Sequence, residues 1–305
     1  MPSGASTGAR PSAVPSPHDG AGAPPTPAHP RLLEARPPRL RRCALGPPRD
    51  AAACYTRVTL ERLSIELTDR CAKACAFCYA RATPAGARSW ALADVLALLR
   101  DCAAHGTRAV SFGGGEPLEY PHLLELLHAT RGLLFRSVTT SGLLVDALLP
   151  ALAGAAPNKI HLSIHEPADR EEVERVAWQV AAVEDHGIRA GVNLLVRRSG
   201  LDAAREAART LREAGIRNDR VTYLPMRPSD TPSADELASV TGGPFQSATC
   251  IAGCSPSPRF ASLAADGTVA HCAYTRERAR LSTFTHAALV ETLGRLGVAP
   301  CGAVP

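Results

Sequence analysis

The sequence predicts an α/β protein, built as a partial (β/α)6 TIM-like barrel and followed by a small C-terminal domain that bears cysteines. Short β-rich runs alternate with longer helical patterns from Leu63 onward, and this order implies parallel strands joined by right-handed crossovers. Polar and glycine-rich residues gather where the strands end, which is where an α/β barrel carries its active site. Six units would close only partly and leave a lateral opening.

The strands are expected, in chain order, at Leu63–Thr68, Arg108–Phe112, Arg136–Thr140, Lys159–His165, Ile188–Val196 and Arg220–Pro225. Between them apolar residues recur at spacings of three and four, which is typical of amphipathic helices. These helices are expected at Ser89–His105, His122–Arg131, Val145–Gly154, Asp169–His186 and Leu201–Ala214. The alternation stops after Pro225, so the barrel is expected to end there.

Composition divides the chain into three regions. Residues 1–55 form a Pro/Ala/Arg-rich tail, in which the first 50 residues hold 12 of the 26 prolines. Such a segment has little apolar surface to bury and is expected to be disordered. Residues 56–228 form the barrel, and residues 229–305 form a Pro/Ser/Thr-rich linker followed by the cysteine-bearing region.

The charge distribution argues against a nucleic-acid partner. Seven arginines against three acidic residues in the first 50 positions account for +4 of the net charge of +5. The rest of the chain is therefore close to neutral, with no basic cluster to match a polyanion. No stretch approaches the roughly 18 apolar residues of a membrane span, and no secretory signal is evident. We therefore expect a cytoplasmic protein without a membrane partner.

A first cysteine group follows the first strand. Cys71, Cys75 and Cys78 lie within eight residues of one another. Three thiolates on one loop can each bind one iron of an iron–sulfur cube and leave the fourth iron open to another ligand. They also fit a catalytic zinc with one open position. The spacing alone leaves both possibilities.

A glycine-rich turn follows the second strand. It reads Gly113-Gly114-Gly115-Glu116-Pro117. Glycines there allow the backbone to approach a ligand closely, and Glu116 can accept from an ammonium group. The run is neither a phosphate-binding loop nor a dinucleotide fingerprint, because both sequence patterns are absent.

The two motifs together, in a chain of βα repeats, resemble the radical S-adenosylmethionine (radical SAM) superfamily over about residues 61–226. The resemblance implies that Cys71, Cys75 and Cys78 bind a [4Fe–4S] cluster. It also implies a set of residues that bind S-adenosylmethionine (SAM): Phe77, Gly114, Gly115, Glu116, Ser141, Ser163 and Asn193. Ser141 stands where many relatives carry asparagine.

The C-terminal cysteines resemble the opening of SPASM/Twitch auxiliary-cluster domains, in which a β-hairpin with a glycine turn brings cysteines together. This resemblance implies one auxiliary [4Fe–4S] cluster on Cys254, Cys272 and Cys301. Cys250 is either a fourth ligand or a free thiol that faces the active site. The alternative is a small zinc site or buried thiols. Cys102 falls in an apolar helix and is expected in the core.

Polar residues near two strand ends are candidates for contact with substrate. The fourth strand reads His161-Leu-Ser163-Ile-His165, and alternate residues face the same side of a strand. Buried polar groups require partners, so we expect His165 to contact substrate. Tyr223, near the end of the sixth strand, is a second candidate.

The resemblance implies reductive SAM cleavage and hydrogen abstraction from a small-molecule or peptide substrate, with a reducing partner such as flavodoxin or ferredoxin. The expected reaction is the redox-neutral epimerisation of a sugar or aminocyclitol natural product, similar to that of radical SAM aminoglycoside epimerases, with Cys250 as hydrogen donor. One alternative is a peptide maturase or a radical alcohol dehydrogenase that passes an electron to the auxiliary cluster. A second alternative is a non-enzymatic zinc-binding scaffold.

Overall fold

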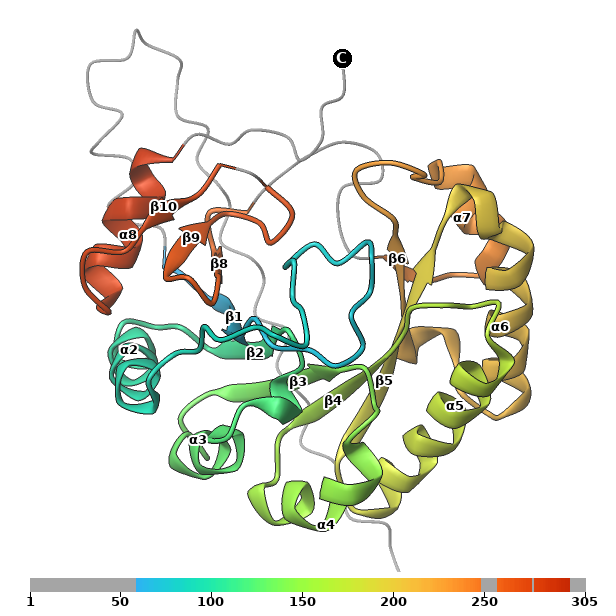
Figure 1. Ribbon diagram of the computed structural model, residues 1–305, viewed down its shortest axis with the longest axis horizontal. Coiled ribbons are helices and arrows are strands. Elements are labelled where there is room, and N and C mark those ends of the chain that lie inside the picture. Colours follow the sequence, from blue (N-terminus) through green and yellow to red (C-terminus); the bar gives the residue numbers. More distant parts are fainter. Residues whose placement is uncertain (1–58, 248–256, 276, 297–305) are drawn as a thin grey trace, which may run out of the picture. The chain divides into compact units, whose positions relative to one another are not determined.

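A computed structural model describes residues 59–247, 257–275 and 277–296, all within one compact unit, Asp50–Pro305. Figure 1 shows a twisted sheet with helices along its outer side. The strands are β1 (Arg62–Thr68), β2 (Ala109–Gly114), β3 (Phe135–Thr140), β4 (Lys159–Ile164), β5 (Arg189–Val196), β6 (Val221–Pro225), β7 (Gln246–Ser247), β8 (Phe260–Leu263), β9 (Thr268–Ala270) and β10 (Ala279–Arg280).

The helices are α2 (Leu92–Ala104), α3 (Leu123–Ala129), α4 (Val145–Ala155), α5 (Arg170–Asp185), α6 (Leu201–Glu213), α7 (Ala234–Thr241) and α8 (His286–Arg295). Three short 3-10 turns accompany them: η1 (Pro117–Glu119), η2 (Arg198–Gly200) and η3 (Asn218–Arg220). Across the described ranges, none of the helices is long and apolar enough to cross a membrane.

The strand order is β10-β9-β8-β1-β2-β3-β4-β5-β6-β7, and every neighbouring pair from β8 to β7 is parallel. The two edge strands, β10 and β7, do not pair, so the sheet is open rather than a closed barrel. All six expected strands and all five expected helices are present with small shifts at their ends. The predicted α/β class with a partial parallel barrel is confirmed.

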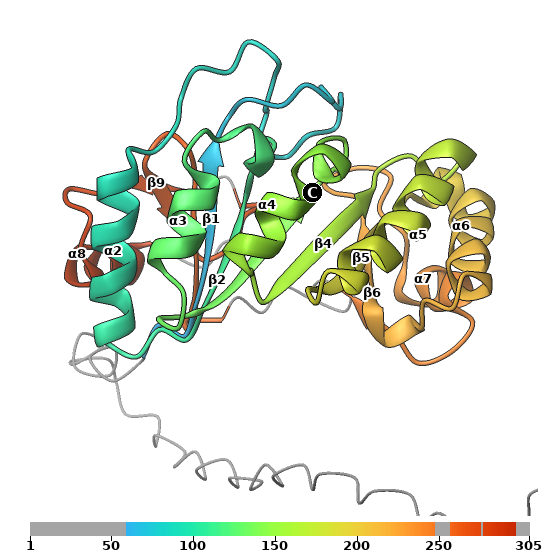
Figure 2. The same ribbon diagram turned by 90° about the horizontal axis from the view of Figure 1, so that it is seen from below.

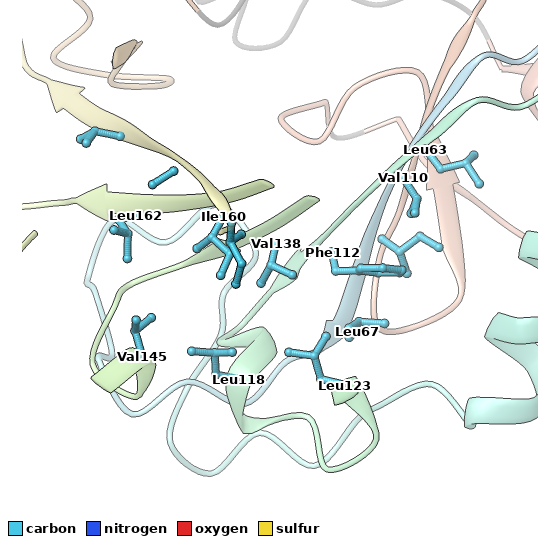
Figure 3. Packing of buried hydrophobic residues seen from close by; sticks show 14 of the residues in the cluster. Leu63, Leu67, Val110, Phe112, Leu118, Leu123, Val138, Val145, Ile160 and Leu162 are labelled. Atoms are coloured by element: carbon cyan, nitrogen blue, oxygen red, sulfur yellow. The ribbon is translucent and has the colours of Figure 1, made fainter. Parts of the chain in front are cut away.

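The strands separate an apolar outer face from a polar inner face. In β1, Leu63, Ile65 and Leu67 are at most 2% exposed and pack outward toward the helices. Figure 3 shows Leu63, Leu67, Val110 and Phe112 in this layer. Since side chains alternate along a strand, Ser64, Glu66 and Thr68 occupy the other face of β1. The inner face is therefore polar where most barrels are filled by branched apolar residues.

The region expected to form a small C-terminal domain joins the same sheet. Strand β8 runs parallel to β1, and the backbone N–H of Arg62 donates to Arg259 O at 3.0 Å. Strand β9 returns antiparallel to β8 through a turn at Gly267, where φ is +80°. Strand β1 would otherwise leave its backbone groups unpaired along one side, and β8 satisfies them.

The Pro/Ser/Thr-rich linker expected from residue 229 onward contains a helix, α7. Ser233 caps its first turn: the Ser233 hydroxyl accepts from Glu236 N–H, and the Glu236 carboxylate accepts from Ser233 N–H. This capping box precedes the buried residues Leu237 and Val240. The expectation of an irregular linker was wrong here. It relied on the frequency of Pro, Ser and Thr, whereas the capping box and the apolar residues after it predict a helix.

Candidate active site

One cavity, of about 270 Å³, collects most of the residues that the sequence singles out. It lies at the carboxyl ends of the parallel strands, where the loop that follows β1 projects beyond the sheet (Figure 2). We call it the cofactor cavity. The expected site residues in its walls are Cys71, Cys75, Phe77, Cys78, Gly114, Gly115, Glu116, Ser141, Ser163, His165 and Asn193. Parallel strands end at one edge of a sheet, so residues far apart in sequence meet there.

The first cysteine group forms a compact loop with three free, half-buried thiols, Cys71, Cys75 and Cys78. The loop is closed by backbone hydrogen bonds: Cys71 N–H donates to Thr83 O at 2.9 Å, and Cys78 N–H donates to Cys75 O at 3.0 Å. Burial raises the pKa of the Cys71 and Cys75 thiols. A metal that binds here must therefore displace their protons.

This donor set fits an iron–sulfur cluster. The three thiols come from one loop and line one cavity, and each can bind a different iron. Among the residues that the structure describes, no three His, Cys, Asp or Glu side chains converge closely enough to hold a single metal ion. A cluster does not need such convergence, because its irons occupy separate corners of the cube.

The glycine-rich turn brings the end of β2 against this loop. Gly115 N–H donates to Thr68 O, and Glu116 N–H donates to Arg70 O, each at 2.7 Å. A Cβ on Gly115 would lie 1.9 Å from Arg70 O, so no larger residue fits. Gly114 has a φ of +116°, which favours glycine. The glycines therefore allow the close contact that sets the cysteine loop over the strand ends.

Glu116 is 2% exposed and accepts four hydrogen bonds from the chain itself. Its Oε1 accepts from Thr140 Oγ1 at 2.7 Å and from Leu118 N–H at 3.1 Å. Its Oε2 accepts from the hydroxyl of Ser141 at 2.6 Å and from its N–H at 2.9 Å. The carboxylate thus joins the ends of β2 and β3. The expected contact of Glu116 with an amino group of SAM stays a prediction, and so does the role of Ser141.

Ser163 and Asn193 lie side by side in the register of β4 and β5 and face the cavity. Two residues before Ser163 on β4, His161 Nδ1 lies 3.3 Å from Asn193 Oδ1. Because an amide oxygen only accepts, Nδ1 is the donor. Burial, followed by the charge of Lys159, lowers the pKa of His161 to about 4. His161 is therefore neutral at physiological pH and fixes the orientation of the Asn193 amide.

Phe77 lies between two side chains from neighbouring strand ends. The Arg197 guanidinium lies 4.3 Å from the centroid of the ring, and the His165 ring centroid is 6.2 Å away. Arg197 in turn donates two hydrogen bonds to Glu166, at 3.0 and 3.1 Å. This cation–π contact fixes an aromatic face at the cavity wall. The expected packing of Phe77 near adenine stays a prediction.

A buried ion pair, which the sequence reasoning missed, ties the cysteine loop to α5. Lys73 Nζ lies 2.9 Å from Glu172 Oε1, which also accepts the backbone N–H of His165 at 2.9 Å. Glu172 is 4% exposed. Burial and then the charge of Lys73 lower the pKa of His165 to about 4. The available signals were a lysine between Cys71 and Cys75 and a glutamate in the first turn of α5.

Tyr223 is a correction to the expected site. It is fully buried, its hydroxyl donates to Asn218 Oδ1 at 3.1 Å, and its ring packs edge-on against Phe245. The next residue, Leu224, lines the cofactor cavity instead. Since residues alternate along β6, Tyr223 points away from that cavity and cannot contact a substrate there.

The second cysteine group is only partly within the described residues. Cys272 follows β9, is half-buried, and its Sγ accepts from Tyr274 N–H at 3.4 Å. Cys250, Cys254 and Cys301 lie outside the described residues. The expected hairpin with a glycine turn is present, and the auxiliary cluster stays a prediction.

The sequence model of the Radical SAM superfamily matches residues 65–238. The chain belongs to this superfamily. Membership makes the chain an enzyme rather than a zinc-binding scaffold, and it implies a [4Fe–4S] cluster and SAM as cofactors. The cysteine loop and glycine turn described above lie within the matched residues.

Curated relatives match parts of the chain. A GTP 3',8-cyclase of Chlorobaculum tepidum is 32% identical over 117 residues, which cover 37% of this chain and 35% of that protein. The PqqA peptide cyclase of Gluconobacter oxydans is 30% identical over 204 residues, which cover 59% of this chain and 55% of that protein. The chain thus spans about one third to one half of the length of these two relatives.

Solved structures share the fold. The Streptococcus suis SuiB structure bound to S-adenosylmethionine superposes with a TM-score of 0.59 at 16% identity and covers 73% of this chain and 63% of its own. The anSMEcpe structure with bound AdoMet superposes with a TM-score of 0.58 at 13% identity. The match covers 76% of this chain and 78% of the anSMEcpe chain. At this level of identity the likeness supports the fold alone.

Proposed function

We propose that this enzyme reductively cleaves SAM and uses the resulting 5'-deoxyadenosyl radical to abstract hydrogen from its substrate. The observation that carries the proposal is the cofactor cavity, in which three thiols, a glycine cradle and the Ser163–Asn193 pair face one another. A bound [4Fe–4S] cluster would supply the electron for cleavage, with Cys71, Cys75 and Cys78 as its ligands. Flavodoxin or ferredoxin is the proposed reducing partner, and the cytoplasm the proposed location.

We propose a peptide as the substrate. The PqqA peptide cyclase aligns over 59% of this chain, compared with 37% for the GTP 3',8-cyclase of Chlorobaculum tepidum and 57% for that of Mycolicibacterium smegmatis. Among the structures with the same fold, SuiB is described bound to precursor peptide SuiA and anSMEcpe bound to the Cp18Cys peptide. The open sheet leaves a lateral path by which an extended chain could reach the strand ends.

The experiment is an assay of 5'-deoxyadenosine after anaerobic reconstitution with iron and sulfide. With dithionite and SAM, wild type should form this product, and the Cys71/Cys75/Cys78→Ala triple variant should form at least about a hundredfold less. Cys102→Ala is the matched control, because Cys102 is fully buried in α2, outside the cavity. Equal product from wild type and the triple variant would contradict the proposal.

The second candidate is epimerisation of a sugar or aminocyclitol with Cys250 as hydrogen donor. It predicts that Cys250→Ala still forms 5'-deoxyadenosine but no longer yields the product epimer. A peptide reaction that transfers an electron to an auxiliary cluster on Cys254, Cys272 and Cys301 instead makes product formation depend on the cysteines that bind this cluster. There the Cys272→Ala variant would lose product and the auxiliary iron together.

A further inference from the structure

A second, larger cavity of about 590 Å³ adjoins the cofactor cavity. The loop after β1, the segment after β6 and the β8–β9 hairpin form its walls, and we call it the hairpin cavity. The two cavities share Phe77, Cys78, Tyr79, Met226, Arg227 and Tyr274. A molecule in the hairpin cavity would therefore lie beside the cofactor, where a substrate for hydrogen abstraction must be.

Glu66 contributes a buried carboxylate to this cavity from the inner face of β1. It is 7% exposed, and Gly114 backs onto it so closely that a Cβ there would lie 2.9 Å from Glu66 Cβ. No Lys, Arg or His nitrogen of the described ranges lies within 4.0 Å of its carboxylate. Burial raises the pKa of Glu66 to about 7. The charge of Arg278 and the backbone N–H of Ala265 favour the ionised form of Glu66 and offset burial only in part, and no cation of the described ranges forms an ion pair with its carboxylate.

Among the described residues, four arginines line the same cavity, Arg81, Arg88, Arg227 and Arg278, and none of them forms an ion pair with Glu66. Arg278, whose charge partly offsets the effect of burial on Glu66, donates to Thr268 Oγ1 at 3.1 Å and to Ser262 O at 3.4 Å. Arg88 is paired with Asp69 at 2.6 Å. Asp266, at the hairpin turn, acts against ionisation of Glu66. Arg88 and Arg278 are thus held by the loop and hairpin themselves.

Two aromatic rings line the same cavity. The Tyr79 ring, on the cysteine loop, lies 5.0 Å from the Tyr274 ring, which follows the hairpin. A buried carboxylate near aromatic faces is the usual setting for an ammonium group, since the carboxylate neutralises its charge and the rings attract it.

We propose that the hairpin cavity binds the substrate of the radical reaction through an ammonium group that pairs with Glu66. This rests on the proposed function of the cofactor cavity. The ammonium can come from a lysine side chain of a peptide or from an aminocyclitol, since both carry the same group. Recognition would be electrostatic, and it would set one end of the substrate at Glu66 and direct the remainder toward Phe77 and Cys78.

The test measures binding of two matched probes to the reconstituted full chain by calorimetry at pH 8. Nα-acetyl-lysine amide carries an ammonium, and Nα-acetyl-norleucine amide is its neutral counterpart. Wild type should bind the lysine probe at least about tenfold more tightly, and Glu66→Gln should lose that preference. Glu125→Gln is the matched control, because Glu125 is an exposed glutamate on α3, outside both cavities.

A third probe, the diamine 2-deoxystreptamine, separates the two sources of ammonium. Tighter binding of this probe than of the lysine probe, with the same dependence on Glu66, identifies an aminocyclitol; the reverse identifies a peptide. Equal affinity of wild type for the lysine and norleucine probes, or a preference that survives in Glu66→Gln, would overturn the proposal. A wild-type protein that forms no 5'-deoxyadenosine would instead contradict the proposed function. The two failures can be told apart, because the binding assay does not depend on SAM cleavage.

Discussion

Two buried glutamates distinguish the cofactor cavity from the hairpin cavity. Glu116 accepts four hydrogen bonds from its own chain, whereas the Glu66 carboxylate interacts with the backbone N–H of Ala265 and has no ion-pair partner among the described residues. The first carboxylate is saturated and holds two strand ends together. The second is buried at comparable depth, 7% against 2% exposed, and faces an open volume. A saturated carboxylate fixes geometry, and a buried carboxylate without an ion-pair partner is suited to a cationic ligand.

The same difference extends to how the two cavities are built. Backbone hydrogen bonds between Gly115 and Thr68 and between Glu116 and Arg70 define the cofactor side. On the hairpin side, backbone pairing of β8 with β1 attaches the hairpin to the sheet, and the Tyr79–Tyr274 ring pair joins the hairpin to the cysteine loop through side chains. The part proposed to hold the cofactor is therefore built on close backbone contacts, and the part proposed to meet the substrate includes side-chain contacts between distant segments.

The largest effect is expected for Gly115→Ala, which tests whether the cofactor side is fixed by its backbone. The added Cβ would lie 1.9 Å from Arg70 O, so the loop must move. We expect a loss of about 3 kcal/mol of stability, a fall in Tm of roughly 10 °C, and loss of SAM cleavage.

Gly113→Ala is the control for stability, since a Cβ there would meet nothing within 4 Å. Its Tm should stay within about 2 °C of wild type. Similar melting of the two variants would show that close backbone contact does not define this cavity. Differential scanning calorimetry of the reconstituted proteins gives both values.

A second effect concerns the ion pair that ties the cysteine loop to α5. Glu172→Gln leaves the Lys73 ammonium without its carboxylate partner and with little access to water. We therefore expect the free energy of unfolding to fall by about 2 kcal/mol and iron to be released faster to a chelator. Lys73→Met together with Glu172→Gln should cost less than the sum of the single variants, because the double variant leaves no unpaired charge. Strictly additive losses would mean that the pair does not hold the loop.

A third effect is the pH dependence that Glu66 contributes to stability. Its pKa is about 7 in the folded chain, above the ordinary 4.5, so the folded state keeps a proton that the unfolded state loses. This contribution is present at low pH and lost as pH rises through 7. Between pH 5.5 and 8, wild type should lose about 2 kcal/mol relative to Glu66→Gln. Urea titrations at the two pH values measure it, and a constant difference between the proteins would contradict an unpaired Glu66.

The smallest effect is expected for Ser141→Ala. It removes one of the four hydrogen bonds to Glu116, the 2.6 Å contact from the hydroxyl, and leaves the bond from the Ser141 backbone N–H. We expect a loss of about 1 kcal/mol in urea unfolding. Ser239→Ala, on the exposed side of α7, should cost less than about 0.5 kcal/mol. If both variants cost the same, saturation of Glu116 is not what stabilises the strand ends.

The cofactor side could be predicted because its signals are local. The cysteines lie within eight residues, and the glycine turn directly follows a strand, so topology alone brings the two motifs together. Strand periodicity likewise gave the inner position of Ser163. The same alternation did not predict the position of Tyr223. An alternating pattern shows that Tyr223 and Leu224 face opposite sides of β6, but it does not show which of the two faces the cavity.

The hairpin side could not be predicted, because its residues meet only through the sheet order. Glu66 and Arg278 are more than 200 positions apart, and they come together because β8 pairs with β1. Nothing in the expected small C-terminal domain required that pairing. Glu66 itself stands in a strand whose alternation is ordinary, and only burial beside an open volume distinguishes it.

The iron content of the reconstituted protein tests the central claim most directly. Iron and sulfide are measured for wild type, Cys102→Ala and the Cys71/Cys75/Cys78→Ala triple variant under the same anaerobic conditions. We predict that the triple variant holds about four irons per chain fewer than wild type and that Cys102→Ala holds as many as wild type. Equal iron in all three proteins, or none in wild type, would contradict a cluster on these three cysteines.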